Sequence, residues 1–74
     1  MNALSHQIEA PYLYSKYLPT QVALLVFKNI KDVLPDVHVV RQGSQTQLFA
    51  LVTGSDDEAF IERYIQVAQR IYGK

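Results

Sequence analysis

The fold is decided by residues 37–53, which read Val37-His38-Val39-Val40-Arg41-Gln42-Gly43-Ser44-Gln45-Thr46-Gln47-Leu48-Phe49-Ala50-Leu51-Val52-Thr53. Two runs rich in β-branched and aromatic residues flank the dipeptide Gly43-Ser44, and such runs favour strands. A glycine at the first central position of a two-residue loop is typical of a type II′ turn, which matches the twist of antiparallel strands. The stretch therefore predicts a β-hairpin.

The predicted hairpin has two unlike faces. Its turn places Gln42 opposite Gln45 and Val39 opposite Leu48, and side chains alternate between the faces along each strand. The more apolar face carries Val37, Val39, Leu48, Ala50 and Val52, with Arg41 and Thr46 near the turn. The mixed face carries His38, Val40, Gln42, Gln45, Gln47, Phe49 and Leu51. We expect the first face to belong to the core.

A C-terminal amphipathic helix is expected over residues 55–73. Ser55 with Glu58 three residues later fits the capping-box pattern, and acidic residues suit the first turn of a helix. Apolar residues then fill one arc of the helical wheel, and polar residues fill the other. Gly73 stands where a glycine would end the helix.

A second helix is expected over residues 19–34. Proline is common at the start of a helix and just past its end, and Pro19 and Pro35 occupy these positions. An apolar stripe supports the helix: Ala23, Phe27, Ile30 and Leu34, widened by Val22, Val26 and Val33. A buried strand from Val22 to Phe27 is the alternative, because periodicity cannot classify a short apolar run. Leu24 and Leu25 fall outside the stripe, so the N-terminal segment covers them, or a second subunit does, or they stay exposed.

The N-terminal segment, residues 1–18, leaves alternatives open. Leu4 and Ile8 suit a short helix. Residues 12–17 suit a third strand by their aromatic alternation, or a helical turn or irregular structure begun by Pro11. As a strand, the segment would place Tyr12 and Tyr14 on one face and Tyr17 on the other. The whole chain is expected to be one small α+β domain: helix, β-hairpin and amphipathic C-terminal helix.

Composition narrows the function classes. The chain has 74 residues, of which 49% are hydrophobic and 19% charged, with a net charge of zero. This balance argues against a disordered chain and against a dedicated polyanion binder. The chain has no cysteine, which excludes disulfides and thiolate metal sites. We expect a cytoplasmic protein, with no signal peptide and no membrane partner, since its longest apolar run is far shorter than a span.

No catalytic, cofactor or metal site is predicted. His6 and His38 share no ligand motif, so both are expected to be ordinary histidines, although a pH-sensitive interface at His38 is an alternative. Residues 56–58 lack the spread of acidic residues that a calcium loop needs and are assigned to the helix start. Ser55 is assigned to capping rather than to nucleophilic chemistry, and the chain has no glycine-rich phosphate loop.

The apolar surplus points instead to a partner. An isolated hairpin is marginal and has open edges unless residues 12–17 or a second chain pair with it. We therefore expect a non-enzymatic protein–protein interaction, adaptor or regulatory module, homodimeric and also binding an unidentified protein. The candidate interface residues are Tyr12, Tyr14, Tyr17, Leu24, Leu25, His38, Val40, Phe49 and Leu51.

Two alternatives remain. The first is weak binding of single-stranded nucleic acid, in which aromatic rings stack on bases beside basic side chains. Its residues would be Tyr12, Tyr14, Lys16 and Arg41. The second is an accessory subunit of a larger complex.

Overall fold

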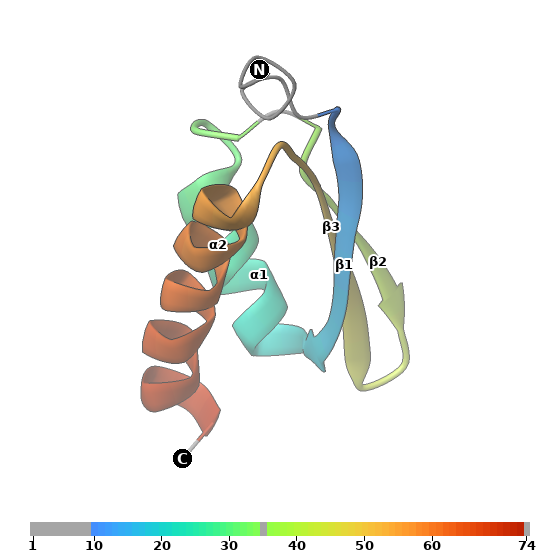
Figure 1. The fold of residues 1–74 in the computed structure, drawn as a ribbon. Helices are drawn as coiled ribbons and strands as arrows, with labels where there is room; N and C mark the ends of the chain where they lie inside the picture. The colour runs from blue at the N-terminus through green and yellow to red at the C-terminus, as the bar shows by residue number, and fades with distance from the viewer. Residues whose placement is uncertain (1–9, 35, 74) are drawn as a thin grey trace, which may run out of the picture.

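Three antiparallel strands form a sheet in the order β1-β3-β2, and both helices lie against one side of it (Figure 1). The computed structural model describes residues 10–34 and 36–73. Its elements run in the order β1 (Tyr12–Pro19), α1 (Thr20–Ile30), β2 (His38–Gln42), β3 (Gln45–Val52), α2 (Ser55–Ala68) and a π-helical turn, η2 (Gln69–Gly73). The predicted α+β class is confirmed.

The core is built on β3, the central strand. The side chains of Leu48, Ala50 and Val52 are fully buried, and Thr46 is 1% exposed. They point toward the helices, where they meet buried apolar residues of both: Val22, Ala23, Val26 and Ile30 from α1, and Ile61, Ile65 and Ala68 from α2. Val37 and Val39 pack against this cluster and are half-buried. The more apolar face of the hairpin is thus the core face, as predicted.

The hairpin has the predicted register. Gln42 lies opposite Gln45 and Val39 lies opposite Leu48. Gly43 has a φ of 67°, a left-handed conformation that glycine adopts without steric cost. Asp36 is the only non-glycine residue with a positive φ in the described part of the chain, so Ser44 has a negative φ, which fits the expected type II′ turn.

Residues 12–17 form a strand, which selects one of the alternatives left open by the sequence. This strand, β1, pairs with β3 along its whole length, from Tyr12 opposite Val52 to Pro19 opposite Gln45. It covers the edge of β3 that a bare hairpin would leave open. Leu4 and Ile8, which suit a short helix, lie outside the described residues, and so does His6.

Helix α1 follows β1 without a loop, and the alternative of a buried strand at Val22–Phe27 is wrong. Two bonds tie its first residue to the hairpin. The Thr20 amide donates to the Ser44 carbonyl at 3.3 Å, and the Thr20 and Thr46 hydroxyls lie 2.9 Å apart. The helix ends at Ile30, four residues before the expected end, and the chain continues in turns. A proline disfavours helical geometry in the residue before it, and Pro35 follows Leu34. Val33, expected in the apolar stripe of this helix, is 62% exposed.

The predicted capping box at the start of α2 is wrong. Ser55 is the first helical residue, Gly54 precedes it, and no side chain caps the helix. Asp57 instead accepts bonds from the Thr53 amide at 2.9 Å and the Thr53 hydroxyl at 3.0 Å. Glu58 accepts a bond from Tyr12 rather than reaching back to the cap. In the acidic first turn of α2, Asp57 therefore bonds to the preceding loop and Glu58 bonds to β1.

The buried stripe of α2 is narrower than the predicted arc. Ile61, Ile65 and Ala68 are buried, whereas Val67, Ile71 and Tyr72 are exposed. The helix continues as the η2 turn. The end of the C-terminal segment thus carries apolar side chains that the core does not use.

The hydroxyl pair of Thr20 and Thr46 yields a first prediction. Thr46 is fully buried, so Thr20→Val leaves its hydroxyl without this partner and should lower the free energy of unfolding by about 1–2 kcal/mol. Thr46→Val should cost less, because the Thr20 hydroxyl is only half-buried. Urea unfolding of both single variants and the double variant measures the coupling. Strictly additive losses would contradict a direct bond between the hydroxyls.

Candidate functional site

The side of the sheet turned away from the helices is the candidate site, and we call it the open face. Every second residue of β3 points away from the core, and residues directly opposite on β1 and β2 share its side. The open face consists of Leu13, Ser15, Tyr17 and Pro19 from β1, of Gln45, Gln47, Phe49 and Leu51 from β3, and of His38, Val40 and Gln42 from β2.

The open face contains no aspartate, glutamate, lysine or arginine. The three strands include two such residues, Lys16 and Arg41, and the register places both on the side of the helices. An antiparallel sheet with one solvated face ordinarily carries its polar residues on that face. Here the distribution of charge is the reverse.

Large apolar side chains lie exposed on the open face. Leu13 is 60% exposed, Tyr17 54% and Val40 45%, and Phe49 and Leu51 are half-buried between them. Cross-strand pairing joins them into rows. Leu13 lies beside Leu51, and Phe49 lies between Ser15 and His38 in the next row. The apolar side chains therefore lie in neighbouring rows of one face and are not scattered over the molecule.

Five of the candidate interface residues from the sequence meet on this surface: Tyr17, His38, Val40, Phe49 and Leu51. Sequence reasoning missed Leu13. Its position two residues after Pro11, in alternation with Tyr12 and Tyr14, was visible, but its neighbour Leu51 becomes evident only from the pairing of β1 with β3. The remaining candidates lie elsewhere in the fold.

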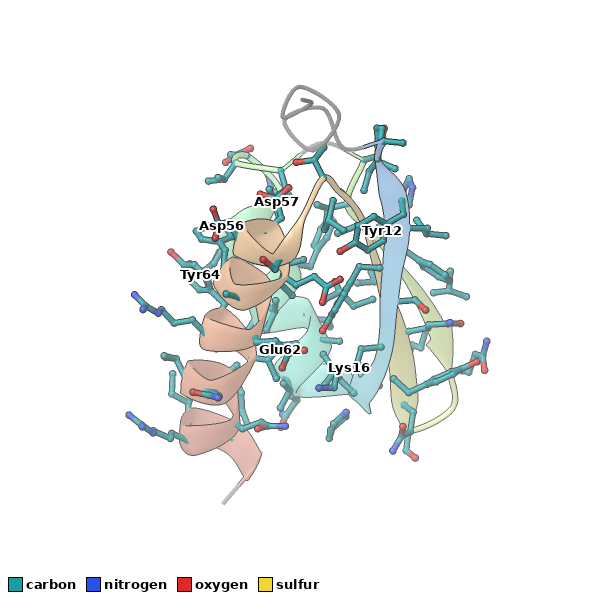
Figure 2. The ribbon with its side chains drawn as sticks, viewed as in Figure 1. Tyr12, Lys16, Asp56, Asp57, Glu62 and Tyr64 are labelled. Atoms are coloured by element: carbon teal, nitrogen blue, oxygen red, sulfur yellow. The ribbon has the colours of Figure 1, made fainter. Side chains whose placement is uncertain are left out.

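Tyr12 points the other way, toward α2 (Figure 2). Tyr14, two residues along the same strand, lies on that side too. The Tyr12 hydroxyl donates a hydrogen bond to Glu58, and the Tyr14 hydroxyl donates one to Glu62. The Lys16 ammonium lies 3.3 Å from both carboxylate oxygens of Glu62. These alternate residues of β1 meet carboxylates one turn apart on α2, so the contacts form a polar ladder that fastens strand to helix.

Within the ladder, Tyr14 is held neutral and Glu62 ionised near neutral pH. Burial raises the pKa of Tyr14 well above its usual value of 10, and its hydrogen bond to Glu62 adds to the rise. The hydrogen bond from Tyr14 lowers the pKa of Glu62, and Lys16 contributes. A neutral phenol donating to an ionised carboxylate is a stable tie. It also sets carboxylates beside the rings that a nucleic-acid base would need to reach.

Leu24 and Leu25 lie on α1, apart from the open face, and differ from each other. Leu25 packs against the core and is half-buried, whereas Leu24 is 46% exposed. With Gln21, Lys28 and Tyr72 they line a shallow pocket of about 260 Å³. Sequence reasoning missed the approach of Tyr72, which depends on how η2 packs against α1.

No group of three or more histidine or carboxylate side chains is placed to hold a metal ion within the described residues. None of the helices in the part of the chain that the structure describes is long and apolar enough to cross a membrane. The chain matches no family model, no curated protein and no solved structure.

The ladder predicts a specific pH dependence of stability. The pKa of Glu62 is lowered by folding, so its contribution is present above the unfolded value of 4.5 and is lost as the pH falls through the folded value. Tyr14→Phe should lower the free energy of unfolding by about 0.5–1.5 kcal/mol at neutral pH. The unmodified chain should lose free energy of unfolding as the pH falls from about 6 to about 3, and Tyr14→Phe should lose less over the same range.

Urea unfolding followed by circular dichroism at several pH values measures both effects. Tyr64→Phe is the matched control, because Tyr64 packs edge-on against Phe60 and its hydroxyl makes no hydrogen bond to the described residues. An acid profile of Tyr14→Phe identical to that of the unmodified chain would contradict the assigned tie.

The two adjacent leucines of α1 should respond differently to truncation. Leu25→Ala removes core contacts and should cost about 1–3 kcal/mol of the free energy of unfolding. Leu24→Ala should change it by no more than about 0.5 kcal/mol, because the side chain is largely exposed. Thermal unfolding of both variants measures the difference, and equal losses would show that the pocket is part of the core.

Proposed function

We propose that this chain is a non-enzymatic protein–protein interaction module, in an adaptor or regulatory role, that docks through the open face of its sheet. The observation that carries the proposal is the reversed distribution of charge. Lys16 and Arg41, the charged residues of the strands, lie on the helix side, and the solvent side presents apolar, amide, hydroxyl and imidazole groups.

The energetics of the open face support a partner. Burying apolar area contributes roughly 25 cal/mol per Å², so Leu13, Tyr17 and Val40 together represent a sizeable association free energy left unused in the single chain. Contiguous exposed patches of this kind mark interaction sites in soluble proteins. Aromatic residues are enriched and charged residues depleted at the centres of protein interfaces, and the open face shares both features.

The same surface supports a protein partner over a nucleic acid. Affinity for nucleic acid comes largely from lysine and arginine contacts to phosphates, and the open face has neither residue. Tyr12 and Tyr14, the rings of the nucleic-acid alternative, instead donate hydrogen bonds to Glu58 and Glu62. A neutral face of apolar and amide groups complements another protein surface.

Site-specific photo-crosslinking in the source cell tests the proposal. A benzophenone amino acid at position 40, on the open face, should give discrete covalent protein adducts. The same group at position 66, on the exposed side of α2, serves as the control. Phe49→Lys, which places a charge at the centre of the face, should abolish the adducts from position 40. The absence of adducts from position 40, or adducts that survive Phe49→Lys, would refute docking through the open face.

A further inference from the structure

We propose that the partner of the open face is a second copy of this chain, packed face to face about a twofold axis parallel to the strands. The inference rests on the proposed function, since it names the occupant of the same surface. Three observations carry it: the neutrality of the face, the order of its side chains from one end to the other, and its area.

Neutrality makes the face compatible with itself. Two identical charged surfaces repel each other unless their charges alternate in register, whereas a face without lysine, arginine or carboxylates has no such cost. The open face likewise offers no charge that would select a different partner with a charged surface. A copy of the same neutral surface needs only matching shape and matching polarity.

The side chains of the face change in character along the strands. One end holds the Leu13–Leu51 pair and the row of Phe49, the middle holds Tyr17, Gln47 and Val40, and the end next to the hairpin turn holds Pro19, Gln45 and Gln42. The face is thus apolar at one end and rich in amides at the other. This gradient decides how two copies must be oriented.

A twofold axis parallel to the strands lays each row on the same row of the other copy. Phe49 then meets Phe49, and Tyr17 on β1 lies over Val40 on β2 of the second copy, so apolar groups meet apolar groups. The glutamines meet glutamines, whose amides can bond to each other. An axis across the strands would reverse the order of the rows and set Leu51 against Gln45 and Phe49 against Gln47, and unpaired amides are costly to bury.

The same orientation gives the imidazole a suitable neighbour. His38 shares a row with Phe49 and Ser15, on opposite sides of β3. Exchange of the two outer strands across the axis brings His38 over Ser15 of the second copy. The two imidazoles of the dimer are therefore kept apart, and each lies near a hydroxyl group.

The area predicts a dimer of moderate affinity. The two eight-residue strands, β1 and β3, are about 27 Å long and the five-residue β2 about 17 Å, and three strands spaced about 4.8 Å apart make a face at most about 14 Å wide. Protruding side chains raise the accessible area above this footprint, but it stays at or below the roughly 800 Å² per partner of a standard interface. Interfaces at the small end of the range are typical of weak or transient complexes, so we expect a dimer that dissociates on dilution.

Pairing through the outer edges of β1 or β2 would leave Leu13, Tyr17 and Val40 in water, because edge pairing extends a sheet without covering its face. Aligned packing of two sheets about 10 Å apart covers both faces together. Face-to-face packing is thus the arrangement that buries the apolar surface. It also leaves the helices and the pocket at Leu24 and Tyr72 on the outside of the dimer.

Sedimentation equilibrium tests the association. The unmodified chain should sediment as twice its mass of 8.4 kDa at about 100 µM and dissociate on dilution. Phe49→Lys and, on the outer strand, Val40→Lys should each weaken association at least about 30-fold. Gln66→Lys adds the same charge on α2 and should leave association unchanged. Circular dichroism establishes that each variant is folded.

Cysteine crosslinking tests the orientation, since the chain has no native cysteine. An equimolar mixture of Tyr17→Cys and Val40→Cys chains, treated with a short bismaleimide, should give a mixed dimer in high yield. Paired Gln66→Cys chains should give little. A crosslink between two Val40→Cys chains that exceeds the mixed product would place the axis across the strands and overturn the orientation.

A monomer at about 100 µM, with no crosslink in any combination, would overturn the second copy as the occupant. The photo-crosslinking from position 40 separates that outcome from a failure of the proposed function. Adducts to a different protein would leave the interaction module intact while removing the homodimer. Adducts of two copies of this chain that Phe49→Lys abolishes would support both.

Discussion

The central strand, β3, lies between the other two strands and shares one core with both helices. The strand pairs with β1 along its whole length and with β2 from Gln45 to Phe49, so most of its backbone polar groups are satisfied within the sheet. Its alternate residues Leu48, Ala50 and Val52 are completely buried under both helices. A shift of register by one residue would turn these side chains to the opposite face, so the strand determines at once what is core and what is surface.

The first strand, β1, connects the sheet to both helices. It covers an edge of β3, leads directly into α1, and holds α2 through Tyr12, Tyr14 and Lys16. The same alternation that directs these polar residues toward the helices directs Leu13 and Tyr17 to the other side. The polar ladder and the open face are thus two consequences of one strand. A change in its register would remove both.

The chain has more apolar residues than its small core can bury. A chain of this size has room for one thin core, and two helices cover one side of a three-stranded sheet. Apolar residues beyond that core must be exposed or covered by a partner. The open face collects them with amides and without charge, which is the pattern of an interface centre rather than of a solvated sheet.

The hairpin, its register, its core face and the C-terminal helix can be predicted from the sequence, because those features follow from glycine at a turn and from apolar periodicity over short distances. For Val22–Phe27 the sequence allowed a helix or a buried strand, and packing between distant segments settled this and the remaining features. It selected a strand for residues 12–17, ended α1 at Ile30, and drew Asp57 and Glu58 away from the expected helix cap. It also placed Leu13 beside Leu51 and Tyr72 beside Leu24. These contacts join segments far apart in the chain, and no local pattern specifies which distant segment a strand or helix end will meet.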